Sequence, residues 1–535
     1  MTVPGYQGLH LYYGDLHSHC DVGYGQGTVE DAYANARLQL DFASVTAHAV
    51  WPDMPESDER LAATLAYHRR GFARAAARWP HLREVTNAAN EDGRFVTFLS
   101  YEWHSLRYGD HNVYYRDGQG EIVAAADLDE LRTALRRLAA TGAATLLVPH
   151  HIGYRAGYRG IDWGTFTSEF SPVVEIVSMH GVAVSDDAPY PYLHTMGPRD
   201  GRGTMQYGLR LGKVFGVIGS TDHHAAHPGS HGWGRTAVWA EGLTRRAIWE
   251  ALVQRRVYAL TGDRIALAFA INGHPMGSLL DAVPTRHLDV AVEAGDAVDY
   301  VDVVHNGVVL RRWTPAAAAD ADGACTVTLE LGWGDRTDPV EWRVDLRVVG
   351  GRLLDVEPRL RGHDTVSPTS GAAGGAVLSA WERWDDRVVL RTTTRGNPNP
   401  LTPGTQALCL RLEGDASTRI RGRINDRPVD LPLAALRQGA HVEYLGGFRT
   451  PAYRFGRVVS RRESSGTFTL EHRGEGGPDW YYVCVRQTNH QWAWSSPIWV
   501  GAPTPASGAP SRVAGSIRTR RGRVAGARAP ATRQD

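Results

Sequence analysis

Gly14-Asp15-Leu16-His17-Ser18-His19 directly follows the apolar run Leu9–Tyr13 near the beginning of the chain. The run is typical of a buried β-strand, and the polar residues mark the point where that strand ends. Residues two apart on a strand lie on the same face, so the imidazoles of His17 and His19 can reach one ion. A pair of this kind also occurs by chance, so its meaning depends on the rest of the chain.

The same arrangement recurs through the first half of the sequence, where further strand-like runs end in residues that can bind a metal. The runs and the residues after them are Phe42–Val45 with His48, Phe95–Ser100 with Glu102, Ala143–Val148 with His150 and His151, and Val214–Ile218 with Asp222, His223 and His224. The carboxyl ends of parallel strands meet at one mouth of a barrel, where such folds carry out chemistry. Imidazoles and carboxylates gathered there suit several divalent cations. The pattern therefore predicts a metal-dependent hydrolase.

Strand-like and helix-like stretches alternate over residues 9–262, which predicts a mostly parallel α/β fold. Thr28-Val29-Glu30-Asp31 and Asp127-Leu128-Asp129-Glu130 are typical helix starts, because each begins with a capping side chain and has an acid three residues on. After about Arg264 the runs are short, β-rich and separated by Gly, Pro and Asp turns. Asn306-Gly307, which lies between β-branched residues, predicts a hairpin.

We therefore expect an α/β domain over residues 1–264, a β-sandwich-like region of one or two modules over 265–500, and a disordered basic tail over 501–535. The Gly- and Ala-rich stretch Ser367–Ala376 would either link two modules or form a loop within one. Aromatic residues are dense near the end of the β region and would form either a sugar-binding face or, as we favour, a packed core. They are Trp480, Tyr481, Tyr482, Trp492, Trp494 and Trp499.

The composition excludes several classes of protein. The formal net charge of the 535 residues is zero, which argues against a dedicated nucleic-acid-binding protein. The four cysteines are widely spaced and predict neither a disulfide framework nor a thiolate zinc site. Because no apolar run is long enough to span a bilayer and no secretory signal precedes the first strand, we expect a cytoplasmic protein.

Five motifs, taken in order, resemble those of the PHP (polymerase and histidinol phosphatase) superfamily. They are Gly14–His19, Val45-Thr46-Ala47-His48, Tyr101-Glu102-Trp103 with Gly109–Tyr114, Val148-Pro149-His150-His151, and Ser220-Thr221-Asp222-His223-His224. Each motif alone is weakly specific, whereas five in sequence are fairly specific. The ending Ala493–Val500 is similar to that of a poorly characterised PHP-related family that carries a C-terminal β region.

The resemblance implies a distorted (β/α)7-type barrel, followed by the β region, that holds two or three ions of Zn, Mn or Fe. Transferred motif by motif, His17, His19, Glu102 and Asp222 would hold one ion. Glu102 would bridge to a second ion, whose other ligands would be His111 and His150. His48 and His224 would hold a third ion.

Three positions limit this transfer. His151 is the alternative to His150, because adjacent strand residues point to opposite faces, and we favour His150. Ala47 replaces the aspartate that is usual in the second motif, and Gly25 stands where many relatives have a histidine ligand of the third ion. The third site is therefore expected to be weak or empty.

Three further residues are candidates for a catalytic role. His180 could donate a proton to the leaving group, and Glu175, at the end of the run Val173–Ile176, could orient a metal ligand. Arg155, in the loop after His151, could clamp an anionic substrate. Two of them have a plain structural alternative: Glu175 as a buried acid paired with an arginine, and Arg155 as a solvated loop residue.

The expected function is hydrolysis of a small-molecule phosphate ester by a metal-activated hydroxide. The ligands account for the hydroxide, and the family resemblance supplies the substrate class. One alternative is metal-dependent hydrolysis of a C–O or C–N bond, because hydroxide attacks either centre. A second is a non-catalytic protein in which the metal is structural and the β region binds a glycan or a partner. The sequence does not indicate an oligomeric state.

Overall fold

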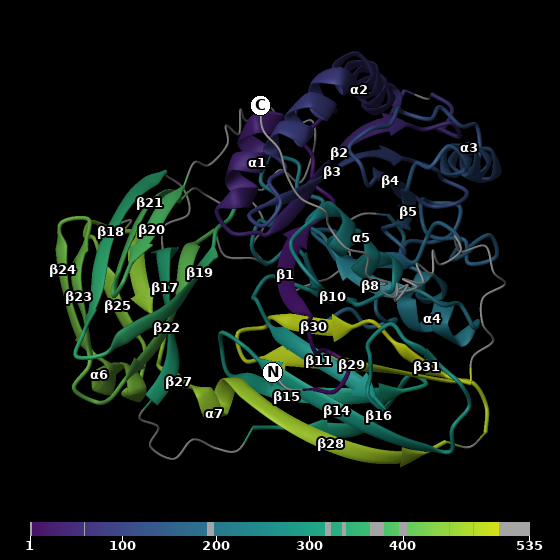
Figure 1. Ribbon diagram of the computed structural model, residues 1–535. Helices are drawn as coiled ribbons and strands as arrows, with labels where there is room; N and C mark the ends of the chain where they lie inside the picture. Colours follow the sequence, from purple (N-terminus) through teal and green to yellow (C-terminus); the bar gives the residue numbers. More distant parts are fainter. Residues whose placement is uncertain are drawn as a thin grey trace, which may run out of the picture.

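The computed structural model describes residues 3–57, 59–189, 197–315, 323–333, 339–363, 379–394, 404–448, 450–474 and 476–501. The expected linker Ser367–Ala376 and the expected tail beyond Gly501 lie outside these residues. The fold is mixed α/β, with many strands and few helices (Figure 1). No helix in the described ranges is both long and apolar enough to cross a membrane.

The N-terminal strands carry the residues of interest at their ends. Strands β1 (His10–Asp15), β2 (Phe42–Val50) and β3 (Val96–Trp103) are parallel neighbours, and β4 (His111–Tyr115) and β5 (Thr145–Pro149) follow β3 in antiparallel pairings. A separate sheet contains β6 (Val173–Ser178), β7 (Gly181–Val182) and β8 (Gly216–Gly219), in which β6 and β8 are parallel.

The helices of this part cover the outside of the strands, as Figure 1 shows. They are α1 (Val29–Arg37), α2 (Ala62–Ala89), α3 (Leu128–Ala140), the 3-10 helix Gly201–Gly203, α4 (Met205–Arg210) and α5 (Arg245–Val253). The side chain of Thr28 accepts a hydrogen bond from the backbone N–H of Asp31, and that of Asp127 accepts one from the N–H of Glu130. Both predicted helix starts are therefore confirmed, because each capping oxygen meets a backbone donor that the first turn leaves unpaired.

The strand pairing differs from the mostly parallel sheet that the sequence predicted. Strand β4 returns antiparallel to β3, because residues 104–110 between them are too few for a crossover connection. Among the described strands, β5 and β6 also belong to different sheets. The hydrogen-bonded pairings therefore do not show a regular (β/α)7 barrel.

The C-terminal strands join the same sheet as the N-terminal ones. Strand β9 (Arg235–Ala240) pairs with β1, β10 (Val257–Leu260) pairs with β9, and β30 (Trp492–Ser495) pairs with β10. The rest of this 13-stranded sheet consists of β13 (Leu279–Leu280), β15 (Val298–His305), β16 (Val308–Trp313), β29 (Asp479–Gln487) and β31 (Ile498–Val500). Residues far apart in the sequence thus share one continuous sheet.

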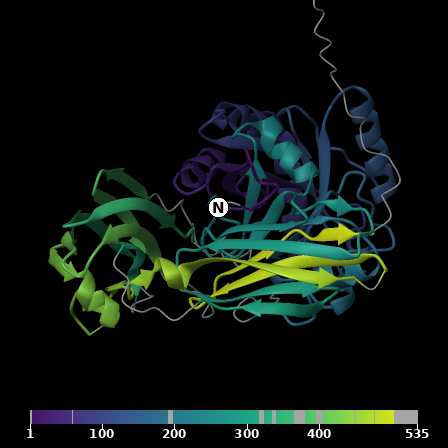
Figure 2. The ribbon, with the colours of Figure 1, turned by 60° about the horizontal axis from the view of Figure 1, so that its bottom comes forward.

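A second layer packs on this sheet and forms a sandwich, which Figure 2 shows from below. It contains β11 (Ala266–Ile271), β12 (His274–Pro275), β14 (Thr285–Glu293) and β28 (Ser465–Arg473). The hairpin predicted at Asn306-Gly307 is confirmed, because both residues have positive φ angles (51° and 86°) between the antiparallel strands β15 and β16. The aromatic residues near the C-terminus are buried core residues, as we favoured.

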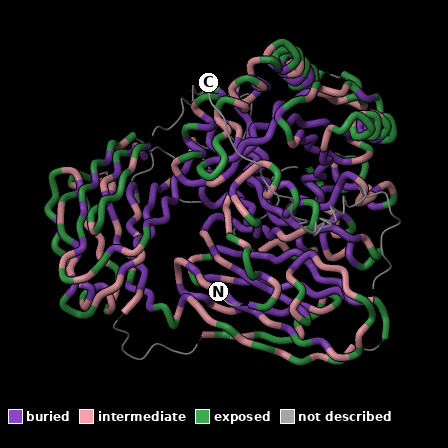
Figure 3. The backbone as a smooth tube through the Cα atoms, viewed as in Figure 1, coloured by how far each residue is buried: buried purple, intermediate pink, exposed green. Residues whose placement is uncertain are grey.

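A separate two-layered β module lies to the left in Figure 1. One layer contains β17 (Gly323–Trp333), β19 (Arg352–Arg359), β22 (Gln406–Gly414), β25 (His441–Tyr444), β26 (Ala452–Phe455) and β27 (Val459–Ser460). The other contains β18 (Val340–Val349), β20 (Ala380–Trp384), β21 (Arg387–Thr394), β23 (Arg419–Ile424) and β24 (Arg427–Pro432). Two short helices, α6 (Leu433–Gln438) and α7 (Arg461–Ser464), complete it. Buried backbone is continuous through all these parts (Figure 3).

A buried polar network connects the N-terminal part to the β module. Nε2 of His231 lies 2.7 Å from Oδ1 of Asp263, and Nδ1 of the same ring lies 3.1 Å from the guanidinium group of Arg361. Arg359 contacts the other oxygen of Asp263 at 3.0 Å. Burial, together with the charge of Arg361, lowers the pKa of His231 to about 3, so the imidazole is neutral in the folded protein.

We expect acidification to lower the stability of the protein. The His231→Gln variant should lose less stability on acidification than the wild type does. The unfolded imidazole has a pKa of about 6.5, well above the folded value, so between the two values the unfolded chain binds more protons and acid favours unfolding. At about pH 5 this histidine should account for about 2 kcal/mol. Urea unfolding of the wild type and the variant at about pH 7.5 and about pH 5 gives the unfolding free energy that each loses on acidification. An equal loss in the two proteins would contradict the prediction.

Candidate metal centre

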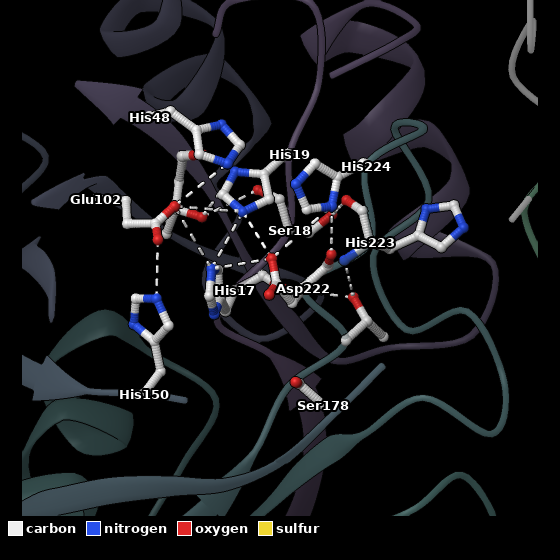
Figure 4. Close-up of polar contacts among 12 residues, drawn as sticks. His17, Ser18, His19, His48, Glu102, His150, Ser178, Asp222, His223 and His224 are labelled. Carbon is white, nitrogen blue, oxygen red and sulfur yellow. Dashed lines mark hydrogen bonds and ion pairs between the residues drawn. The ribbon is translucent and has the colours of Figure 1, made fainter. Parts of the chain in front are cut away.

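Imidazoles and carboxylates at or near the ends of several strands point toward one another, as Figure 4 shows for His17, His19, His48, Glu102, His150 and Asp222. The expected metal ligands brought together are His17, His19, His48, Glu102, His150, Asp222 and His224. With them lie His180, a catalytic candidate, His151, the alternative to His150, and two further residues, His104 and Asp110. All of them except His224 are buried. Their donor atoms form overlapping groups in which all atoms of a group lie within 4.8 Å of one another, which is close enough to share a cation.

Glu102, on β3, lies in the middle of the cluster. Its Oε2 is 3.3 Å from Nε2 of His48 and 3.6 Å from Nε2 of His19. Its Oε1 is 2.8 Å from Nε2 of His150 and 3.2 Å from Nδ1 of His104. The two oxygens of one carboxylate therefore face two different sets of imidazoles, the arrangement that a bridging ligand requires.

His17 and His19 present their Nε2 atoms to the same point. Nδ1 of His17 lies 3.1 Å from a carboxylate oxygen of Glu175, and Nδ1 of His19 lies 2.6 Å from the carbonyl oxygen of Thr46. Because a carboxylate or a carbonyl only accepts, each Nδ1 carries the hydrogen and Nε2 faces the cluster. Metal-binding histidines typically have such an acceptor behind them. Glu175 thus contacts a histidine and not an arginine, which was the structural alternative.

Asp222 is the second shared carboxylate. Its Oδ1 lies 2.9 Å from Nε2 of His19 and 3.4 Å from Nε2 of His17. Its Oδ2 lies 3.1 Å from Nε2 of His180 and 3.2 Å from Nε2 of His151. Asp222 follows β8 with a φ of 53°, a conformation that non-glycine residues adopt rarely and that is concentrated at functional sites.

Both His150 and His151 face the cluster, although the alternation of a strand would place only one of them there. Strand β5 ends at Pro149, and His151 has a φ of 52°. This left-handed residue breaks the alternation, so His150 meets Glu102 while His151 meets Asp222 and His180. The sequence analysis expected one of these two histidines to face the cluster, and the structure brings both of them there.

His111 belongs to none of these groups of described residues. Its Nδ1 lies 2.9 Å from the carbonyl oxygen of Gly109, and its ring packs against Trp103. The preceding residue, Asp110, instead lies with Glu102, His150 and His151. The placement therefore does not support the expectation that His111 shares an ion with His150.

The expected third site contains His48 and His224, with His19 as the third member. Its two departures from the family pattern have structural reasons. Ala47 is buried in an apolar cluster, because it points away from the face of β2 that carries His48. A Cβ atom on Gly25 would lie 2.8 Å from the carbonyl oxygen of Cys20, so a larger residue would require the backbone to move.

The cluster fits divalent cations better than it fits a network of protein hydrogen bonds. Nε2 of His17 and Nε2 of His19 are only 3.1 Å apart, and when both rings are neutral, with the hydrogen on Nδ1, both Nε2 atoms present lone pairs that a shared cation would bind. Two buried oxygens that face the cluster, Oε2 of Glu102 and Oδ2 of Asp222, make no well-aligned hydrogen bond, although imidazole nitrogens lie 3.1–3.6 Å away. Buried polar groups are normally satisfied, so an exception of this size points to an ion.

The charges of the metal-free cluster are arranged around its carboxylates. Burial alone would raise the pKa of Glu102, but the facing imidazoles, with His104 first, hold it well below the usual range. Burial alone would lower the pKa of His17, but Asp222 and Glu175 raise it to about 10. Without an ion, a proton on His17 therefore supplies positive charge that bound metal would provide.

The two arginines of the loop after His151 have different positions. Arg155 is exposed and stacks over Tyr158, so the structure does not bring it to the cluster. Arg159 is largely buried, with Nε 2.7 Å from Oδ2 of Asp110 and Nη2 4.0 Å from Oε1 of Glu102. The permanent positive charge beside the cluster thus belongs to Arg159 and not to Arg155.

Comparison with known proteins yields relatives of unknown function. The family model for a protein of unknown function, DUF3604, matches residues 230–275. An uncharacterized protein of Chlamydia pneumoniae is 25% identical over 256 residues, covering 44% of this chain and 41% of that protein. An uncharacterized protein of Chlamydia muridarum is 30% identical over 173 residues, covering 29% of this chain and 28% of that protein. The chain thus spans less than half the length of these curated relatives.

One solved structure is also similar. It is a two-domain protein from Bacteroides vulgatus described as containing a predicted PHP-like metal-dependent phosphoesterase. The identity is 13%, the TM-score is 0.28, and the alignment covers 81% of this chain and 98% of that chain.

Proposed function

We propose that this protein is a metal-dependent hydrolase that cleaves phosphate esters. The observation that carries the proposal is the position of Glu102, a buried carboxylate whose two oxygens face separate groups of imidazoles. Two groups that share a carboxylate could hold two cations close together. Bound there, divalent cations would lower the pKa of a coordinated water to about 7 and neutralise charge on an anionic substrate.

The phosphate ester is favoured over other substrates for two reasons. The five motifs resemble those of the PHP superfamily, and Arg159 places a guanidinium group beside the cluster, where an anionic substrate would be attracted. We propose as ligands His17, His19, His48, Glu102, His150, Asp222 and His224, with Asp110 and His151 in addition. Zn, Mn and Fe all accept such mixed ligands. Glu175 would orient His17 without contacting an ion itself.

A comparison of substrates tests the proposal. The purified protein, loaded with Mn or Zn, would be given an aryl phosphomonoester, an aryl phosphodiester, an aryl carboxylate ester and an aryl amide. We expect hydrolysis of at least one of the two phosphates, and its loss on chelation. Cleavage of the carboxylate ester or the amide, with neither phosphate cleaved, would establish a hydrolase of C–O or C–N bonds instead. A metal content well below one ion per chain would exclude both metal-dependent hydrolase functions.

Arg159→Gln should slow hydrolysis by about 30-fold, or about 2 kcal/mol, because a charge-assisted contact to an anionic group is of this size. Arg155→Ala, in the same loop but exposed, should change the rate by less than about 2-fold. Steady-state kinetics on the preferred phosphate substrate compares the two. If Arg155→Ala had the larger effect, the loop would have to close differently over the substrate.

His180→Gln tests whether this residue donates a proton to the leaving group. Nε2 of His180 faces Asp222 at the edge of the cluster. A general acid contributes about 10²–10⁴-fold, and it matters most when the leaving group is a poor one. The variant should therefore lose far more activity on an alkyl phosphate than on a nitrophenyl phosphate. Equal losses on both would contradict the role of proton donor.

A further inference from the structure

A second cavity lies away from the metal centre, at the junction of the N-terminal part, the sandwich and the β module. Its volume is about 590 Å³, within the range of small-molecule sites. Residues of all three parts line it, among them His231, Asp296, Arg361 and Gln491. Such junctions are a preferred location for ligand sites.

Most of the side chains that line this junction cavity are polar. Its wall carries four guanidinium groups, from Arg359, Arg361, Arg454 and Arg457, against the two carboxylates of Asp296 and Glu330. Four threonines and two side-chain amides also line it. Arg359 and Arg361 are more than nine-tenths buried, and burying a guanidinium group is costly unless partners compensate for it.

The buried arginines are held rigidly in this wall. Arg359 contacts Asp263 at 3.0 Å and Glu357 at 3.1 Å. Arg361 contacts Nδ1 of His231, and its backbone is bonded on both sides by the amide of Gln406. Preorganised donors of this kind bind carboxylate and phosphate groups with little loss of entropy.

Two donors of the wall also lack an acceptor. Nε of Arg359 and the hydroxyl of Thr326 are buried and have no hydrogen-bond partner in the protein. Each such group costs about 1–3 kcal/mol, so a ligand in the cavity that offered an acceptor to either donor would recover part of that cost. An apolar or cationic ligand would satisfy neither donor.

We propose that the junction cavity binds a small polyhydroxylated anion, of the size and chemistry of a sugar acid or a sugar phosphate. The guanidinium groups would hold its carboxylate or phosphate group, and the threonine and amide side chains would hold its hydroxyls. Its occupation would tie the β module to the part of the chain that carries the metal centre. This binding site is independent of the proposed hydrolysis.

Calorimetric titration of the metal-loaded full chain tests this inference. The probes are D-glucuronate, D-glucose 6-phosphate, inorganic phosphate and D-glucose. We expect at least one of the two sugar anions to bind with a Kd below about 1 mM, and D-glucose to bind at least about 10-fold more weakly. Tight binding of glucuronate alone would identify a sugar acid, and that of glucose 6-phosphate alone a sugar phosphate.

Matched variants locate the binding. Arg457→Ala and Arg387→Ala each remove a half-exposed arginine (45% and 44%) with a single carboxylate partner, but only Arg457 lines the cavity. Arg457→Ala and Thr326→Val should weaken binding by about 10-fold, whereas Arg387→Ala and Glu102→Gln should not. Unchanged binding in both cavity variants, no binding of either sugar anion, or equal binding of D-glucose would overturn the proposal. Loss of sugar-anion binding in the Glu102→Gln variant, with normal binding in both cavity variants, would place the anion at the metal centre.

Discussion

Glu102→Gln should abolish hydrolysis and lower the metal content of the protein. The substitution keeps the shape of the side chain but removes its charge and replaces one oxygen with an N–H donor. That donor would face either the His48 and His19 side or the His150 and His104 side. Mutating partners behind metal ligands typically costs 10–100-fold in affinity or activity, so a shared direct ligand should cost more than about 100-fold.

Metal analysis of the dialysed protein and steady-state kinetics measure the two effects separately. Glu121→Gln is the matched control, because Glu121 is exposed, pairs with Arg83 and belongs to none of the groups of potential ligands among the described residues. The control should keep full activity and metal. A Glu102→Gln protein that retained normal turnover would exclude Glu102 as a bridging ligand.

Removal of bound metal should lower the melting temperature of the wild-type protein by about 10 °C. An ion present at about 1,000 times its Kd stabilises the folded state by about 4 kcal/mol. The melting temperature of a domain of about 150–250 residues shifts by about 2–4 °C for each kcal/mol. The physical reason is that Glu102 and Asp222 are both buried, and without an ion their charges are balanced by neighbouring imidazoles and by the more distant Arg159. Thermal unfolding with and without a chelator gives the shift.

The Glu102→Gln variant provides the internal comparison for chelation. If the ions are held as proposed, chelation should change the melting temperature of this variant much less than that of the wild type. Adding back Zn or Mn should restore the wild-type value. A wild-type protein that verifiably loses its metal without any thermal shift would show that the ions do not support the fold.

Many of the candidate residues could be found from the sequence because their signal is local. An apolar run followed by a histidine or an acid marks a strand end, and this pattern located His17, His48, Glu102, His150 and Asp222 without knowledge of their distances. The helix starts at Thr28 and Asp127 and the hairpin at Asn306-Gly307 were predictable for the same reason. Each depends on groups within a few residues of one another.

The placement of other residues in the cluster depends on loop conformation and strand direction. His151 reaches the cluster because its backbone turns left-handed after β5, and Asp110 reaches it because β4 runs antiparallel to β3. His104 lies two residues after Glu102 and could share its face of the strand, but from the sequence a surface or packing role was slightly favoured. Periodicity carries no information about a single left-handed residue or about the direction of a following strand.

The sequence alone therefore determined which residue types end the strands, because buried strands require apolar runs and polar residues mark their ends. Only the tertiary structure decided how those ends are grouped: Glu102 between two sets of imidazoles, Asp222 between two others, and His111 outside. It also joined β30 to β10 across more than two hundred residues, which creates the junction cavity. Such groupings follow from packing and hydrogen bonds between segments remote in the chain, and no local pattern encodes them.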